Sequence, residues 1–244
     1  MRRSDGRGLA ELRDIVIQPG YLDFAEGSAL VSWGRTRVLC AASVLERVPV
    51  FRQELGGGWV TAEYGMLPRA GHSRQERERG GGIRGRSQEI QRLIGRSLRA
   101  VVDLGGLGER TVVLDCDVLQ ADGGTRAAAV TGAYVALAMA LAGLRRRGVL
   151  EKIPLKDQVA AVSLGRVGGR LLLDLDYEED SQAEVDANFV ATGQGELVEV
   201  QLTGEAGAFP AAWLTEFLEL ALQGIKEVIG RQKEALAPWL PLPW

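Results

Sequence analysis

Hydrophobic and polar positions near the start of the chain follow the two-residue period of β-strands. The segments RDIVIQPG, YLDFAEGSALVSWG and TRVLCAASVLERVPV alternate or run apolar, with glycine-containing turns between them. GWVTAEYGMLP is a further extended segment, which we expect Pro68 to end. The pattern therefore predicts several short strands across residues 12–68, followed by an arginine- and glycine-rich loop.

Helical periodicity takes over after Ser87. In SQEIQRLIGRSLRAVVDLGG, apolar side chains recur on one helical face. Ser87 is a predicted N-cap, and Gly105 or Gly106 a predicted stop. The next segment, RTVVLDCDVLQADGG, is a predicted strand with Asp115 and Asp117 on the same side.

Two further helices are predicted, one over residues 125–147 and one from about Pro210. The first ends in three arginines before Gly148, which is the expected chemistry at a helix C-terminus. Three or four strands with glycine turns are predicted between these helices. This order of elements predicts an α+β (mixed α/β) sandwich and excludes a regular βαβ alternation.

Composition places the chain among soluble globular proteins, with 244 residues, 46% of them hydrophobic and 25% charged. We find no Pro- or Ser-rich linker and therefore expect a single domain over residues 1–244. The stretch MRRSDGRGLAEL lacks the apolar run of a signal peptide, and no later segment is predicted to span a membrane. We expect a cytoplasmic protein in which Cys40 and Cys116 are small buried hydrophobic residues.

The residue types present exclude several kinds of active site. One histidine and two cysteines cannot assemble the usual zinc sites. A Ser-His-Asp triad could use only His72, which lies in a polar segment beside glycine, and there is no Walker-type loop. The net charge of -3 also argues against a uniformly basic nucleic-acid binder.

Charge is nevertheless concentrated in one place. Residues 69–86 carry six arginines against Glu76 and Glu78, a local excess of +4 on an acidic protein. Such a segment suggests that a polyanion is handled at one site.

The stretch DVLQADGGTRAAAV combines a strand, a Gly-Gly turn and an alanine-rich helix start. Helix N-termini expose unpaired N–H groups beside the positive end of the helix dipole, which favours an anion. Arg126 adds a fork of donors that matches phosphate oxygens, and Thr125 adds a hydroxyl. Taken alone, a glycine hairpin with a solvated arginine explains this stretch equally well.

Two other groups could complete such a site. Arg86 precedes the other predicted helix, so two arginines at two helix N-termini could hold one phosphate, although an isolated Arg86 would be an ordinary surface charge. DLDYEEDSQAEVD is an acidic stretch, and most of its side chains are typical of a solvated turn. Asp180 and Asp186 flank that turn, and carboxylates are ligands that Mg²⁺ prefers. Periodicity does not choose which of the acids bind a metal.

Several long stretches together resemble the ribonuclease PH family of bacterial phosphate-dependent 3′-to-5′ exoribonucleases, which trim tRNA precursors. The matching stretches are RSDGR, EGSALVSWGRTRVLCAASV, GWVTAEYGMLPRA, GRSQEIQRLIGRSLRAVVDL, LDCDVLQADGGTRAA and DLDYEEDSQAEVDANFV. They occur in the family's order and cover most of the chain to about residue 195. The resemblance implies a two-layer β/α sandwich, and six chains in a ring built as a trimer of dimers.

The resemblance also implies roles for particular residues. Phosphate, the co-substrate, would bind Arg86, Gly124, Thr125 and Arg126; Arg126 would also act in catalysis. Asp180 and Asp186 would be the catalytic carboxylates and would bind Mg²⁺, with Mn²⁺ as an alternative. Arg69, Arg74 and Arg77 would contact RNA, including the 3′ ends of tRNA precursors. Processing of other RNAs such as rRNA would follow from the same chemistry.

The chain departs from the family pattern in a few places. Gly71 and Ala127 replace residues that are usually larger or threonine in the family, and VQLTGEAGAF differs from the usual sequence. None of these changes a proposed reactive side chain. The alternatives are a non-catalytic ring subunit that threads RNA, a two-metal hydrolytic nuclease and a small-molecule phosphorylase.

Overall fold

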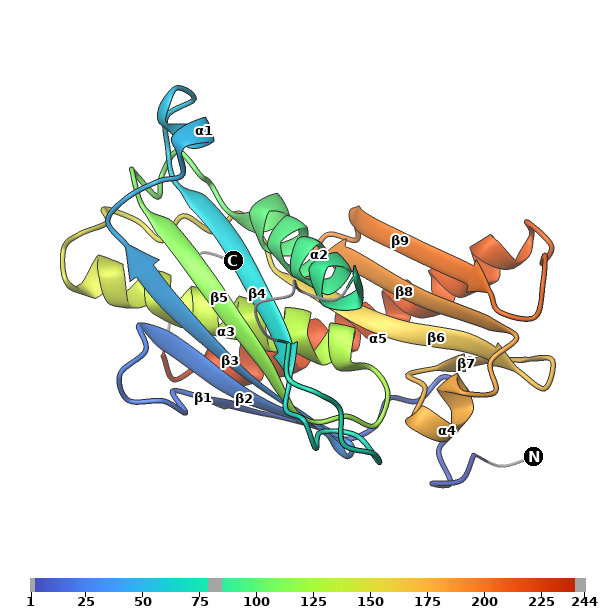
Figure 1. The fold of residues 1–244 in the computed structure, drawn as a ribbon. Coiled ribbons are helices and arrows are strands. Elements are labelled where there is room, and N and C mark those ends of the chain that lie inside the picture. The colour runs from blue at the N-terminus through green and yellow to red at the C-terminus, as the bar shows by residue number, and fades with distance from the viewer. Residues whose placement is uncertain (1–2, 79–84, 240–244) are drawn as a thin grey trace.

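The computed structural model describes residues 3–78 and 85–239, and its strands pair into two sheets (Figure 1). The larger sheet has the strand order β1-β2-β3-β5-β4 and is antiparallel except for the pair β4 and β5. Helix α2 connects these two parallel strands. The strands of this sheet are β1 (Ile15–Pro19), β2 (Gly27–Trp33), β3 (Thr36–Leu45), β4 (Trp59–Met66) and β5 (Thr111–Gln120).

The second sheet is antiparallel throughout, with the order β7-β6-β8-β9. Its register sets polar residues side by side: Ser163 pairs with Asn188, and Asn188 pairs with Gln201. Two positions along β8, Asp186 pairs with Thr203 and lies on the same face because side chains alternate along a strand. The strands are β6 (Val159–Val167), β7 (Arg170–Leu173), β8 (Val185–Thr192) and β9 (Leu197–Gly204).

In the part of the chain that the structure describes, three long helices cover the sheets and two short helices lie in connections. Helix α3 packs against both sheets, α2 packs on β4 and reaches β9, and α5 lies on β6 and β1 (Figure 1). The helices are α1 (Val50–Gln53), α2 (Gly85–Val101), α3 (Thr125–Arg146), α4 (Tyr177–Asp180) and α5 (Trp213–Leu236).

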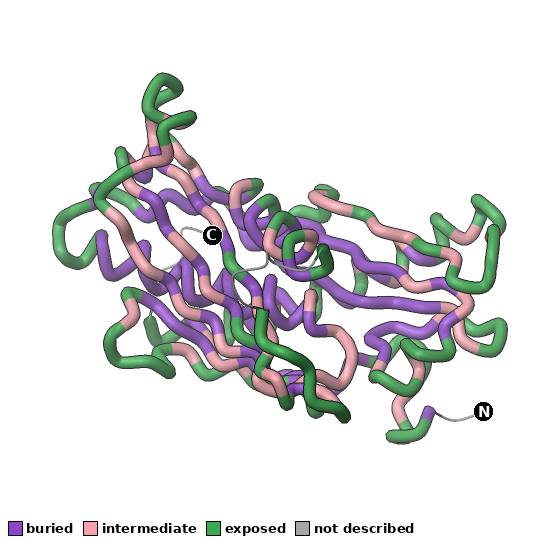
Figure 2. The backbone as a smooth tube through the Cα atoms, viewed as in Figure 1, coloured by how far each residue is buried: buried purple, intermediate pink, exposed green. Residues whose placement is uncertain are grey.

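Helix α3 is the centre of the hydrophobic core. Almost every side chain from Thr125 to Leu144 is buried, because small alanines let strands from both sheets approach the helix closely (Figure 2). Within the described residues it is also the one helix long and apolar enough to cross a membrane, but it is buried inside this fold. One continuous hydrophobic core, to which both sheets contribute, surrounds it.

The architecture confirms the predicted mixed α/β sandwich and corrects some boundaries. Helix α2 begins at Gly85, so Arg86 lies in its first turn and does not precede the helix. Ser87 is therefore not the N-cap; its hydroxyl donates to Glu78, 2.7 Å away. Helices α1 and α4 were not predicted, because four residues are too few to establish a helical period. The division into one domain stays a prediction.

Candidate active site

A cleft of about 540 Å³ lies where the two sheets meet, and it brings together the two predicted halves of the site. Six predicted residues line it: Arg86, Gly124, Thr125, Arg126, Asp180 and Asp186. They come from α2, the start of α3, α4 and β8. Side chains of the second sheet, including Ser163, Asn188, Gln201 and Thr203, also line the cleft.

The Gly-Gly turn has the backbone that only glycine adopts easily. Gly123 and Gly124 have φ angles of 77° and 66°, and Gly124 is the N-cap of α3. A Cβ atom on Gly123 would collide with the carbonyl oxygen of Leu175. The turn therefore packs directly against the segment that leads to Asp180. The first N–H groups of α3 have no acceptors within the helix, as at any helix N-terminus.

Thr125 receives a hydrogen bond from a residue that the sequence did not single out. The Tyr64 hydroxyl on β4 donates to Thr125 Oγ1 at 3.0 Å, and both side chains are buried. Burial raises the pKa of Tyr64, so the phenol stays protonated at neutral pH and remains a donor. Because its oxygen accepts from Tyr64, the Thr125 hydroxyl keeps its own hydrogen for a ligand. The regular alternation of GWVTAEYGMLP places Tyr64 on the inner face but does not reveal this partner.

The Arg126 guanidinium has a hydrogen-bond partner at Nη2 but none among the described residues at Nε. Its Nη2 donates to Glu89 Oε2 at 2.7 Å, and Gln201 donates to the other oxygen of Glu89 at 2.9 Å. Burial opposes the ionisation of Glu89, but these two hydrogen bonds and the charges of Arg126 and Arg86 together lower its pKa. The carboxylate therefore orients the guanidinium as a fixed, charged partner.

Two buried polar atoms of the cleft have no hydrogen-bond partner among the described residues: Arg126 Nε and Ser163 Oγ. A buried donor without a partner costs about 1–3 kcal/mol, which a bound acceptor would recover. The cleft therefore fits a ligand that presents several acceptor oxygens, as phosphate does.

Asp180 and Asp186 approach the cleft from α4 and β8, as the sequence suggested. Burial and the nearby charge of Asp180 raise the pKa of Asp186 to about 6, against the opposing charge of Arg126. Burial also raises the pKa of Asp180, while Arg86 and Arg126 oppose the rise. Two carboxyls with raised pKa values fit a divalent cation, because its charge would favour the ionised form of both. Mg²⁺ commonly takes one or two carboxylates and completes its shell with water and phosphate oxygens.

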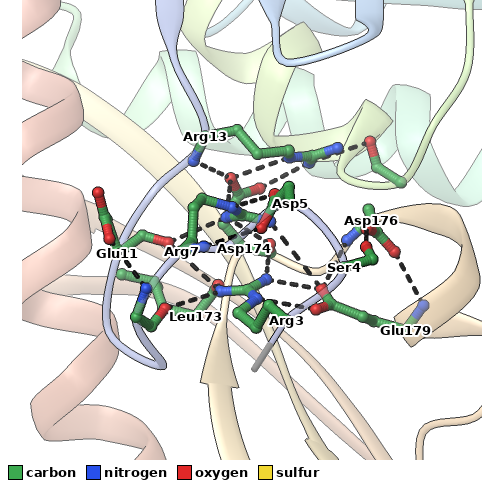
Figure 3. A network of polar contacts seen from close by, with 12 residues as sticks. Arg3, Ser4, Asp5, Arg7, Glu11, Arg13, Leu173, Asp174, Asp176 and Glu179 are labelled. Atoms are coloured by element: carbon green, nitrogen blue, oxygen red, sulfur yellow. Dashed lines mark hydrogen bonds and ion pairs between the residues drawn. The ribbon is translucent and has the colours of Figure 1, made fainter. Parts of the chain in front are cut away.

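A buried ionic network holds the Gly-Gly turn and the segment that leads to Asp180 together (Figure 3). Asp174 is buried at φ 57° and accepts hydrogen bonds from Arg13 Nε at 3.0 Å, Arg13 Nη2 at 2.6 Å and Trp33 Nε1 at 2.9 Å. Arg13 also donates to the carbonyl oxygen of Asp122, immediately before the Gly-Gly turn. Arg13 thus links the Gly-Gly turn to the segment that leads to Asp180.

The N-terminal segment extends this network. Arg3 donates to both carboxylate oxygens of Glu179, at 2.8 and 2.6 Å, and to the carbonyl oxygens of Leu173 and Asp174. These contacts do not follow from the sequence pattern. Arg3 and Arg13 are close to each other in the sequence, but the carboxylates that they bind, Glu179 and Asp174, lie 176 and 161 positions away from them. No local pattern could therefore have paired them.

The three arginines predicted to bind RNA do not line this cleft. Arg69 donates to the carbonyl oxygens of Gly71 and His72, and it lines a neighbouring depression with Arg35. Arg77 lies close enough to Asp117 for its charge to oppose the rise that burial causes in the pKa of that carboxyl. Arg74 is exposed, and its own segment forms part of the rim of the cleft. A role in RNA binding stays a prediction for all three.

This fold and cleft define an enzyme of the 3′ exoribonuclease family, to which the chain belongs. Domain 1 of that family matches residues 11–142, and domain 2 matches residues 157–224. Two relatives are both named Ribonuclease PH. The protein from Moorella thermoacetica is 58% identical over 97% of this chain and 95% of its own length. The protein from Nocardia farcinica is 55% identical over 99% of this chain and 94% of its own length.

Solved structures show the same fold at lower identity. A chain of the Archaeoglobus fulgidus exosome with RNA bound to the active site has a TM-score of 0.79 at 24% identity, covering 94% of this chain and 92% of its own. Rice (Oryza sativa) Rrp46 has a TM-score of 0.77 at 21% identity, covering 96% of this chain and 100% of its own. The predicted family and fold class are confirmed.

Proposed function

We propose that the chain shortens RNA from its 3′ end by phosphorolysis, with tRNA precursors among its substrates. The ribonuclease PH relatives and the family match support phosphate-dependent 3′-to-5′ exoribonuclease activity. The observation that carries the proposal for the site is the meeting of Arg86, Arg126 and Thr125 with two carboxylates in one cleft.

In the proposed reaction, an oxygen of hydrogen phosphate attacks the phosphorus of the last phosphodiester. The bond from that phosphorus to the 3′ oxygen of the preceding nucleotide breaks, and the proton of hydrogen phosphate ends on this oxygen. The products are an RNA shorter by one nucleotide and a nucleoside diphosphate. Because an ester is exchanged for an anhydride at modest cost, abundant diphosphates would drive the reverse reaction.

The protein's part in this step is to bring two anions together. Arg86 and Arg126 cancel the repulsion between the phosphate and the RNA, and the hydrogen bond from Arg126 to Glu89 fixes the guanidinium before substrate arrives. Thr125 and the first N–H groups of α3 add donors to phosphate oxygens. Fixed donors do not need to reorganise during the reaction, so they favour the transition state.

Asp180 and Asp186 would hold Mg²⁺, with Mn²⁺ as an alternative. When bound, the metal neutralises charge on the phosphoryl group and the departing oxygen. The raised pKa values of the two carboxyls support this assignment. They mean that negative charge is unfavourable at both positions, and a bound cation would offset this. The two side chains leave room in the metal's shell for water and substrate oxygens.

RNA would approach over the basic segment that carries Arg69, Arg74 and Arg77, whose charges attract a phosphate backbone.

We propose that six chains assemble as a trimer of dimers, as the family resemblance implies, and that the enzyme works in the cytoplasm. The two free, buried cysteines are consistent with a reducing compartment.

Product identification tests the proposal against its alternatives. The purified chain is incubated with a short RNA bearing a 3′ tail and Mg²⁺, with and without inorganic phosphate. Nucleoside diphosphates that form only with phosphate support phosphorolysis. Monophosphates in both reactions indicate a hydrolase, and no release indicates a subunit that only binds RNA; either result overturns the proposal.

A further inference from the structure

His72 and Tyr177 form an aromatic pair in the cleft, and the reaction described above gives neither residue a role. Their ring centroids lie 5.1 Å apart, and the ring planes are tilted by 42°. The residues come from distant parts of the sequence, yet both line the cleft that contains Asp180, Arg126 and Arg86. Tyr177 is 50% exposed, and His72 is exposed as well. Aromatic surface is thus open to solvent beside the proposed reaction centre.

Tyr177 is displayed by an anchored element. It is the first residue of α4, whose capping box joins Asp176 and Glu179: Glu179 N–H donates to Asp176 at 2.9 Å, and Asp176 N–H donates to Glu179 at 3.1 Å. Arg3 donates two hydrogen bonds to the same Glu179 carboxylate (Figure 3). The exposed ring therefore stands on a fixed support, three residues before Asp180.

The His72 side of the pair is fixed in a similar way. Arg69 Nη1 donates to the carbonyl oxygens of Gly71 and His72 at 3.0 and 2.6 Å, which holds the backbone of the segment that follows β4. His72 is thus positioned by a member of the basic segment itself. Two segments with separately held backbones meet at the two rings, so little backbone ordering remains to be done when a flat ligand binds.

We propose that His72 and Tyr177 form a stacking site for the base of one of the last nucleotides of single-stranded RNA. The inference rests on the proposed function and adds positioning residues to it. Proteins bind single strands by combining cationic grooves with aromatic side chains on which bases stack. Here the aromatic pair adjoins Arg86, Arg126 and the basic segment. Stacking accepts every base, because each has a π-face, and this suits an enzyme that removes successive nucleotides.

Such a site would set the register of the RNA. A base held on the rings fixes its own phosphate relative to Asp180, which lies on the same short helix as Tyr177. Loss of the stack should therefore weaken binding of an RNA that has a base at this position. It should not weaken binding of an RNA that lacks that base.

The test measures equilibrium binding of short single-stranded RNAs without phosphate or divalent metal. Four further RNAs each carry one abasic nucleotide, at one of the four positions nearest the 3′ end. With the unaltered chain, we expect one position at which removal of the base weakens binding by about tenfold. Tyr177→Ala should weaken binding of the intact RNA by a similar factor and should abolish the difference between intact and abasic RNA at that position. His72→Ala should reduce the difference.

Two control variants separate stacking from other causes. Tyr177→Phe keeps the ring and should retain the position-dependent difference, and Tyr21→Ala removes another half-exposed tyrosine, outside the cleft, and should bind as the unaltered chain does. The proposal is overturned if no terminal position depends on its base, if Tyr177→Ala keeps the difference, or if Tyr177→Phe loses it. Phosphate-dependent release of diphosphates by the unaltered chain is scored separately, so failure of the proposed function is distinguishable from failure of the stacking site.

Discussion

At the scale of single residues, Thr125 is already oriented for its proposed role in binding phosphate. Its hydroxyl oxygen is already occupied by the hydrogen bond from Tyr64, so its hydrogen is directed elsewhere. Tyr64→Phe removes that donor and keeps the ring. Because a neutral hydrogen bond contributes about 0.5–1.5 kcal/mol, we expect the KM for phosphate to rise about two- to tenfold. Initial rates measured against phosphate concentration check this.

Tyr134→Phe is the matched control for this variant. Tyr134 is buried on α3 as well, and its hydroxyl has no hydrogen-bond partner within the described part of the chain. Its loss should leave the KM for phosphate unchanged. Equal KM values in the two variants would show that Tyr64 does not orient Thr125.

Asp186 provides a prediction about pH. Its pKa is raised from 3.8 to about 6 in the folded chain. Between pH 3.8 and about pH 6, folding therefore takes up a proton. The free energy of unfolding falls as the pH rises through this range. Above about pH 6, its charge should cost the fold up to about 3 kcal/mol. Asp186→Asn should therefore be more stable than the unaltered chain near pH 7 without divalent metal, and the two should converge near pH 4.

Urea unfolding at several pH values measures this difference. Asp14→Asn serves as the control, because Asp14 is exposed on the surface. A gap in stability that stays constant with pH would show that the charge of Asp186 is not its cause.

At the scale of elements, the two loops of the cleft depend on one buried ion pair. Asp174→Asn would leave the Arg13 guanidinium buried without its counter-charge. Removing one partner of a buried pair typically costs about 3–5 kcal/mol, and we expect urea unfolding to show a loss of that size. Activity should also fall under native conditions, because the turn at Gly123 and the segment before Asp180 lose their common support.

Asp176→Asn is a useful comparison, since Asp176 lies in the same segment and caps α4, whereas the hydrogen bonds of the Arg13 guanidinium to a carboxylate go to Asp174. Complete loss of an N-cap costs about 1 kcal/mol. The amide oxygen that Asp176→Asn introduces can still accept the capping hydrogen bond, so the variant should lose less than that. If Asp174→Asn proved no more damaging than Asp176→Asn, the account of a shared support would be wrong.

The elements also show what periodicity can and cannot predict. Helix α3 and the strand β5 follow from local patterns, because their apolar side chains repeat over many residues. The start of α2 was misplaced by three residues, at Gln88 after the predicted N-cap Ser87, because the polar run from Gly85 to Ser87 carries no apolar period. Helix α4 depends on its capping box and on Arg3, a residue from the other end of the chain. The phosphate candidates came from local chemistry and the choice of Asp180 and Asp186 from the family resemblance, whereas Tyr64, Glu89 and Asp174 needed the three-dimensional structure.

At the scale of the whole molecule, several large apolar side chains face solvent in the single chain. Phe24 is fully exposed, and Val50, Phe51 and Leu55 are largely exposed. Exposed apolar groups of this kind mark surfaces that assembly covers. We expect sedimentation equilibrium to give a mass six times that of the 26.3 kDa chain. A mass of one or two chains at micromolar concentration would contradict the proposed trimer of dimers.

The central claim is that phosphate bound by Arg86 and Arg126 becomes part of the released nucleotide. Isotopically labelled inorganic phosphate tests it directly: the account predicts the label in the β-phosphate of each nucleoside diphosphate. Arg126→Ala should lower the rate of incorporation by about 10²–10³, while Arg147→Ala, at the exposed far end of the same helix, should not. Nucleotides released without label, or full incorporation by the Arg126→Ala variant, would contradict the account.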